Sequence, residues 1–202
     1  MKRAALGVRM HSGWGVMVAM AGDGASLEVL ERRRIVVVDP KIAGGKQPYH
    51  HAARLALGEV GLVGAERHLA NCAAVSGRLA ATVVEDLVRE LSLRQYRVVA
   101  CAVLLASGRA LPSLEKILGA HPLIHTAEGE FFRNAVRRAC EQMKIPVTAI
   151  PERDVEERAR VVFGNVTSRL QQKIGSAGTL MGPPWTKDHK AAALAAATIL
   201  KG

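Results

Sequence analysis

The sequence predicts an α/β fold in which a mixed β-sheet is flanked by helices. Three short apolar runs stand close together at the N-terminus, and glycine-containing turns separate them. Later strand-like runs alternate with amphipathic stretches that have a helical period. With 49% hydrophobic residues, a chain of 202 residues can build one sizeable core. We therefore expect a single domain over residues 1–202, with three antiparallel strands followed by two strands that alternate with helices.

The three N-terminal runs have the character of a meander. Residues 4–11 and 14–20 are apolar, and Ser12-Gly13 between them predicts a hairpin turn. A second turn is expected at 22–24, and residues 26–38 then end in a β-branched run. Three consecutive antiparallel strands follow from this pattern.

The middle of the chain combines helices with a buried strand. Apolar residues recur three or four apart over 65–91, which predicts a long helix whose inner stripe is Leu69, Cys72, Leu79, Val83, Leu87 and Leu91. The nearly unbroken apolar run at 97–105 is typical of a central strand, and Ser107-Gly108 is expected to end it. A second amphipathic helix is expected over 127–144, with its arginines facing outward.

The C-terminal part predicts one short strand and two helices. The strand covers 146–150, and a helix over 153–174 is expected to bend at Gly164-Asn165. A loop over 175–184 then leads to a final alanine-rich helix at 185–200.

The charge and cysteine content of the chain indicate which partners and which cellular compartment to expect. The net charge of +10 favours a polyanionic partner, DNA or RNA, although a generally basic solvated surface is an equal alternative. Three scattered cysteines without zinc-site spacing are typical of reduced core residues. No apolar run approaches a membrane span, and no signal-peptide core is seen. We expect a cytoplasmic protein without a membrane partner.

The order of elements resembles the ribonuclease H-like superfamily, and in particular its Holliday-junction resolvase branch. The resemblance covers nearly the whole chain. It is strengthened by residues 183–195, PPWTKDHKAAALA, which are similar to the resolvase end, where a proline-rich loop leads into a helix with acidic residues before an Ala-Leu-Ala stretch.

The resemblance implies a site with two divalent metal ions, Mg²⁺ or Mn²⁺, held by carboxylates. In the family one Asp lies on the first strand, one acid ends the fourth strand, and one or two lie on the last helix. This chain has Arg9 and His11 on the first strand and no acid at 104–107. Asp188 is in place on the last helix, but Ala192 precedes the Ala-Leu-Ala stretch. One carboxylate cannot hold two ions, so we expect no cofactor unless catalysis survives.

Two candidate residues lie near this expected centre. His11, at the end of the first strand, is either a general base or nitrogen ligand, or a hairpin-end residue near solvent. Asp188 with His189 is either a remnant metal or proton-transfer pair, or part of a helix start capped by Thr186.

Two further carboxylates are candidates. Glu128 lies three residues after His125, on the same helix face, where backbone amides at the helix start could receive an anion. The alternative is capping, with Thr126 as N-cap. Asp39 is either a metal ligand or a turn residue before Pro40.

Two sets of arginines are candidates for phosphate contacts, and the alternative is a solvated face. They are Arg32, Arg33 and Arg34, and Arg133, Arg137 and Arg138. His50 and His51 have no second ligand cluster within sequence reach, so a metal site is not expected there.

Two functional hypotheses remain. The first is a non-catalytic domain that binds nucleic acid, a protein partner or a second copy of the chain. The alternative is a metal-dependent nuclease or phosphoryl-transfer enzyme with a relocated site, built from His11, Asp39, Glu128 and Asp188.

Overall fold

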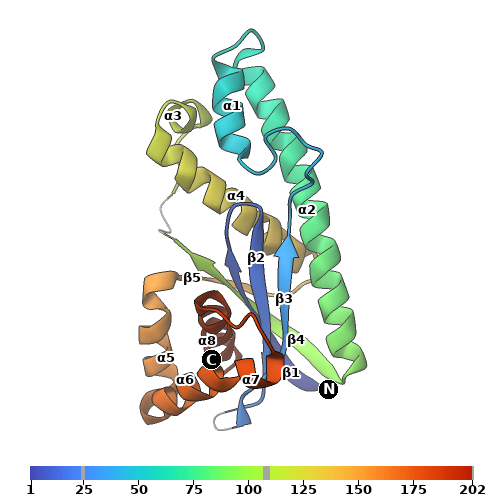
Figure 1. Ribbon diagram of the computed structural model, residues 1–202, viewed down its shortest axis with the longest axis vertical. Helices are drawn as coiled ribbons and strands as arrows, with labels where there is room; N and C mark the ends of the chain where they lie inside the picture. Colours follow the sequence, from blue (N-terminus) through green and yellow to red (C-terminus); the bar gives the residue numbers. More distant parts are fainter. Residues whose placement is uncertain (24–25, 107–109, 202) are drawn as a thin grey trace.

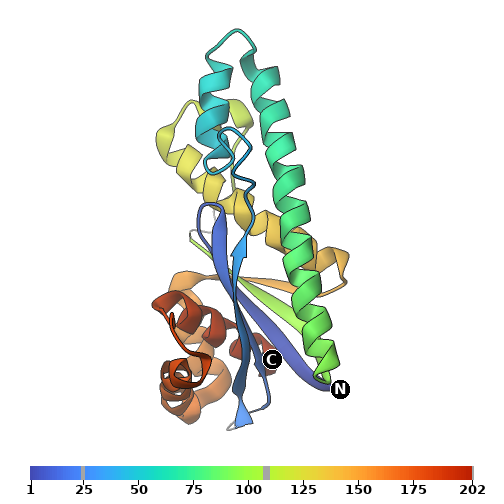
Figure 2. The same ribbon diagram turned by 45° about the vertical axis from the view of Figure 1, so that its right-hand side comes forward.

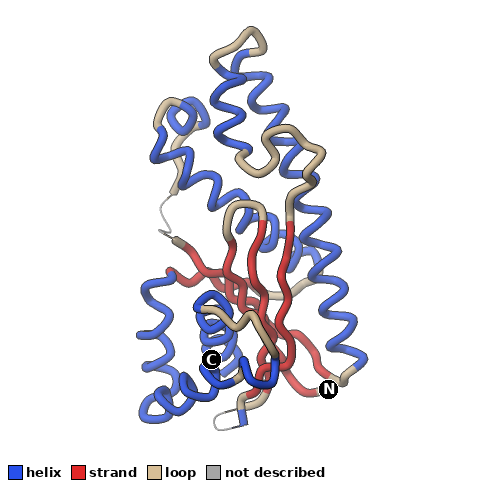
Figure 3. The backbone as a smooth tube through the Cα atoms, in the orientation of Figure 1, coloured by secondary structure: helices blue, strands red, loops and turns tan. Residues whose placement is uncertain are grey.

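The computed structural model describes residues 1–23, 26–106 and 110–201 and has a five-stranded mixed sheet at its centre (Figures 1 and 3). The strand order is β3-β2-β1-β4-β5. The first three strands are antiparallel, while β1, β4 and β5 run parallel, which confirms the predicted architecture. The strands are β1 (Lys2–Met10), β2 (Trp14–Ala21), β3 (Glu28–Val36), β4 (Tyr96–Leu105) and β5 (Val147–Pro151).

Helices cover both faces of the sheet. On one face lie α2 (Gly61–Leu93) and α4 (His121–Gln142), and on the other lie α5 (Val155–Phe163), α6 (Thr167–Ser176) and α8 (Lys187–Lys201). The short elements are α1 (Pro48–Ala56), α3 (Leu114–Leu118), η2 (Glu152–Asp154), η3 (Gly164–Val166) and α7 (Gly178–Met181). No helix of the described residues has the length and apolar character needed to cross a bilayer.

Several expected boundaries hold and others change. The break at Gly164 is confirmed: the residue has a φ of +55° and separates α5 from α6. The expected loop at 175–184 is wrong in part, because α7 lies within it. On α2, Ala80 and Val84 are buried in place of Leu79 and Val83. The helix therefore faces the sheet with an alanine at the position where a leucine was expected. The turn at 22–24 and the strand end at 107–108 lie partly or wholly outside the described residues.

The alternation of side chains along β1 decides what faces α8. Leu6 and Val8 belong to the core with α2 and α4, whereas Ala5 belongs to the core with α8. Because side chains alternate with a period of two, Gly7 and Arg9 share the face of Ala5. Arg9 therefore points toward the start of α8.

Helix α8 lies directly on β1 because its contact residues are small. Its residues 192–197 are all buried, five of them alanine. A Cβ atom added at Gly7 would lie 1.8 Å from the carbonyl oxygen of Ala192. Only glycine fits at this position, and it sets the distance between the helix and the strand.

An arm of helices extends beyond the sheet (Figures 1 and 2). It is formed by α1, α3, the first half of α2 and the first half of α4. A separate small core holds it together, made of Ile117, Ile124 and Ala127 with the partly buried Tyr49, Ala53, Leu111 and Leu123.

We predict that Gly7→Ala destabilises the fold by about 2–3 kcal/mol, because the new methyl group forces α8 away from the sheet. The control is Gly77→Ala on α2, where an added Cβ has no neighbour within 4 Å. There we expect an increase in stability of about 0.5–1 kcal/mol. Urea unfolding monitored by circular dichroism measures both, and equal stability of the two variants would contradict the close packing of α8.

Candidate functional site

The carboxyl ends of the parallel strands β1, β4 and β5 meet at one edge of the sheet, where ligand sites of α/β proteins commonly lie. Arg9 lies near the end of β1, His11 just follows it, and Glu152 directly follows β5. Asp188 comes from the first turn of α8. These four residues are in contact, and we refer to them as the Arg9 cluster.

Arg9 joins two acidic side chains that are far apart in the sequence. One terminal nitrogen lies 2.7 Å from Oε1 of Glu152, and the other pairs with Oδ1 of Asp188. The side chains of Arg9 and Asp188 are 21% and 18% exposed, so the pair is largely screened from water. The Nε atom of Arg9 is buried and has no hydrogen-bond partner among the described residues.

The helical period of α8 explains why Asp188 reaches Arg9. Asp188, Ala192 and Ala196 recur every four residues on one face, and the backbone of the last two lies against Gly7. Asp188 lies one helical turn before Ala192. It is therefore placed over Arg9, the next residue after Gly7 on this face of β1.

His11 completes the cluster and connects it to the surface. Its Nε2 atom lies 2.8 Å from Oδ2 of Asp188, and its ring stacks on Trp14 with centroids 4.4 Å apart. The guanidinium of Arg34 lies 4.5 Å from the centre of the Trp14 ring. The exposed Arg34 guanidinium, the Trp14 ring and the His11 ring thus form a row of contacts from the surface to Asp188.

The surroundings keep Asp188 ionised. Burial alone would raise the pKa of Asp188, but the hydrogen bond with His11 and the positive charge of Arg9 outweigh it and lower the pKa below its usual value. Asp188 therefore carries a full negative charge at neutral pH and stabilises the guanidinium beside it.

His189 forms its hydrogen bonds with Thr186, at the start of helix α8. Its Nδ1 atom accepts the backbone N–H of Thr186 at 3.2 Å and contacts the Thr186 hydroxyl at 2.9 Å. Burial, and then the positive charge of Arg32, lower the pKa of His189, so the ring is neutral and can accept these bonds. The bond from the Thr186 N–H is one half of a capping box, in which the side chain three residues after the N-cap residue accepts that residue's backbone N–H.

The arginines of β3 differ in their contacts. Arg32 donates to the backbone carbonyls of Met181, Pro183 and Pro184 at 3.3, 2.8 and 3.0 Å, which fixes the loop before α8. Arg33 lies 2.5 Å from Oε2 of Glu90 on α2. Arg34 is exposed apart from its contact with Trp14.

The arginines of α4 also differ. Arg133, expected to face outward, is buried, because Gly129 leaves room for its guanidinium and Glu130 pairs with its Nε atom at 3.0 Å. Arg137 and Arg138 are exposed. Arg138 lines a cleft of about 740 Å³ between α2 and α4.

Glu128 lies in the arm and contacts α1. Helix α4 begins at His121 and not at residue 127, so the expectation that Thr126 is the N-cap is wrong; the cap residue is Ala120. The reason is that Pro122 occupies the first turn, where a missing N–H costs nothing. Glu128 is buried, and its Oε1 accepts the backbone N–H of His50 at 3.2 Å and lies 2.9 Å from His50 Nδ1.

Asp39 makes the contact of a turn residue, since its carboxylate accepts the backbone N–H of Lys41 at 2.9 Å. Of the four residues expected to build a relocated site, the structure brings His11 and Asp188 together. Arg9 and Glu152 were not identified as site residues from the sequence. Their signal was positional: each lies at the carboxyl end of a parallel strand.

Comparison with known proteins is informative at the level of structure. No protein-family model matches this sequence, and no curated protein matches it. Thermus thermophilus RuvC matches over 96% of this chain and 92% of its own, with a TM-score of 0.52. The chain has the fold of RuvC.

A second structure, T. thermophilus RuvC in complex with a Holliday junction substrate, matches equally well. It covers 96% of this chain and 91% of its own length, with a TM-score of 0.53. The sequence identities are 16% and 15%, so the RuvC likeness concerns the fold.

The residues at the carboxyl ends of the parallel strands do not fit a pair of divalent cations. Two such ions need several hard oxygen ligands that converge on them. Here Asp188 and Glu152 are both paired with a guanidinium. Across the described ranges, no group of three or more His, Cys, Asp or Glu ligand atoms gathers at this edge of the RuvC fold.

We predict that Asp188→Asn lowers the stability at pH 7 by about 1–3 kcal/mol, because Arg9 and His11 lose a charged partner. Since the folded-state pKa of Asp188 lies below the unfolded one, its stabilisation is present above about pH 4 and is lost as the pH falls further. The variant should therefore show a flatter fall in unfolding free energy below pH 4. Urea unfolding across pH 2–7 measures this.

The control is Glu157→Gln, which removes an exposed partner of Arg160. We expect a change within about 0.5 kcal/mol and an unaltered pH profile. An equal loss in both variants would argue against the Arg9 cluster as a stabilising unit.

Proposed function

We propose that this protein binds nucleic acid through a RuvC fold without cleaving it by metal-dependent chemistry. The observation that carries the proposal is the guanidinium of Arg9, held between Asp188 and Glu152. In this proposal the 202 residues act as one domain, and an internal cation takes the place that the resemblance gives to a metal ion.

Electrostatics supports the non-catalytic part. A divalent ion at this edge would compete with Arg9 for the same carboxylate oxygens and would be repelled by its permanent charge. Freeing Arg9 would leave a largely buried guanidinium without partners, which is strongly unfavourable. Both effects oppose the loading of Mg²⁺ or Mn²⁺.

Charge and surface chemistry support the nucleic-acid part. The net charge of +10 attracts phosphates at long range. Arg34, exposed on β3, stacks on Trp14, and a guanidinium beside an aromatic ring suits both phosphate and base. Arg137 and Arg138 add exposed charge on α4. The related RuvC structure with a Holliday junction substrate makes four-way DNA the first ligand to test.

We predict salt-sensitive binding of four-way DNA, weakened roughly 3–10-fold by Arg34→Gln, with the slope of log Kd against log salt reduced by about one. Fluorescence anisotropy over a salt series measures this. Arg160→Gln is the matched control, because Arg160 is exposed on α5 and pairs with Glu156 and Glu157 of its own helix. Absence of binding near physiological salt would instead favour a protein-interaction role.

We further predict no cleavage of four-way DNA, duplex DNA or RNA–DNA hybrid in millimolar Mg²⁺ or Mn²⁺, since Arg9 already occupies the carboxylates that would have to bind these ions and its charge repels them. A gel assay with end-labelled substrates is the measurement. Metal-dependent cleavage by the wild-type protein that Asp188→Ala abolishes would overturn the proposal and favour the relocated nuclease site.

A further inference from the structure

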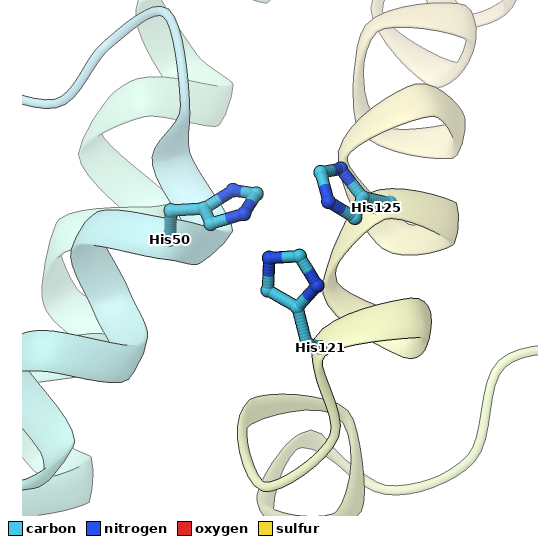
Figure 4. A group of neighbouring side chains, drawn as sticks. All are labelled: His50, His121 and His125. Atoms are coloured by element: carbon cyan, nitrogen blue, oxygen red, sulfur yellow. The ribbon is translucent and has the colours of Figure 1, made fainter.

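Three histidines from distant parts of the sequence converge in the arm, away from the Arg9 cluster. His50 comes from the first turn of α1, and His121 and His125 come from the first two turns of α4 (Figure 4). One ligand atom from each lies within 4.8 Å of the others. We infer that these histidines form a binding site for a divalent first-row transition-metal ion, with Zn²⁺ as the expected occupant.

The rings face a common point. The centroid of the His50 ring lies 5.4 Å from that of His121 and 4.8 Å from that of His125. The His121 and His125 centroids are 4.4 Å apart. Figure 4 shows all three rings directed into the space between α1 and α4. Spacing of four residues places His121 and His125 on one face of α4, as two ligands of one ion require.

Small side-chain rotations are enough to reach ligand geometry. Tetrahedral zinc with Zn–N distances of about 2.0–2.1 Å needs ligand nitrogens roughly 3.3 Å apart. His121 and His125 are exposed, so their rings can rotate without disturbing the core. The ligand nitrogens, now within 4.8 Å of one another, have to move closer by roughly 1.5 Å at most.

Glu128 provides the second observation. This carboxylate is buried, 3% exposed, and its Oε1 lies 2.9 Å from Nδ1 of His50. A carboxylate that accepts the Nδ1 proton orients the imidazole and leaves Nε2 free to bind a metal, as in many zinc proteins. The same oxygen also accepts the backbone N–H of His50, which fixes the ring at the start of α1.

The ligand set selects the class of ion. Imidazole nitrogens suit Zn²⁺, Cu²⁺ and Ni²⁺, while Mg²⁺ and Ca²⁺ prefer oxygen ligands. Three protein ligands leave a fourth position for water on the exposed side, formed by His121 and His125. The bound ion would add a link between α1 and α4 to the small core of the arm and the Glu128–His50 hydrogen bonds. This site does not depend on the function proposed for the sheet edge.

The test uses the full chain without a histidine tag. Titration of the metal-free protein with Zn²⁺ against a chromophoric chelator should give one tight site per chain, and Co²⁺ should give the intense visible bands of four-coordinate geometry. His125→Gln and His121→Gln should each weaken Zn²⁺ binding by roughly 100-fold or more, and Glu128→Gln by roughly 10–100-fold. Both histidines are exposed, so circular dichroism should show unchanged folding.

The matched control is His68→Gln. His68 lies in the same arm on α2, with its ring tilted by 42° against that of His51 and the centroids 4.4 Å apart, but it is outside the cluster. Zn²⁺ affinity and the Co²⁺ spectrum should be unchanged in this variant. The inference is overturned if His125→Gln binds Zn²⁺ as tightly as the wild type, or if His68→Gln loses as much affinity as His125→Gln.

Discussion

Arg9 and its two carboxylate partners form an ion-paired link between three parts of the fold that are far apart in the sequence. Arg9 ends the apolar row of β1, Glu152 begins the segment after β5, and Asp188 begins α8. A largely buried guanidinium is tolerated only when charged partners surround it. Glu152 after β5 and Asp188 at the start of α8 therefore both have to lie beside the end of β1. This requirement places one guanidinium and two carboxylates together at the carboxyl ends of the parallel strands.

The backbone of β1 makes this arrangement possible. Gly7 allows α8 to lie against the strand, and the alanines of the helix keep the distance short. One helical turn from Ala192 to Asp188 then corresponds to one step from Gly7 to Arg9 on the same face of the strand. In a fold with a bulkier contact at Gly7, Asp188 would lie too far from the sheet for a direct ion pair.

Much of the architecture could be predicted from the sequence, because period and turn chemistry are local signals. The N-terminal meander, the buried strand β4 and the break at Gly164 follow from patterns that extend over a few residues. The start of α4 was missed, because Pro122 in a first turn resembles a loop signal. The burial of Arg133 was also missed, since it depends on the space left by Gly129.

The candidate site was less predictable, because its members meet only through the topology. The sequence identified His11 and Asp188 individually, but Glu152 became significant only once β5 was seen to run parallel to β1. The histidine cluster was discounted for lack of partners near His50. The His-x₃-His spacing at His121 and His125 was a visible signal, but nothing local indicated that α1 packs beside it.

The arginines of β3 have a consequence for association between molecules. Strand β3 is one edge of the sheet, and within the described part of the chain its outer side has no partner strand. Unpaired edges invite strand addition by another chain, and charged side chains along such an edge oppose it. Three successive arginines, one of them anchored to the loop before α8, thus hinder the sheets of two copies from joining into a continuous one.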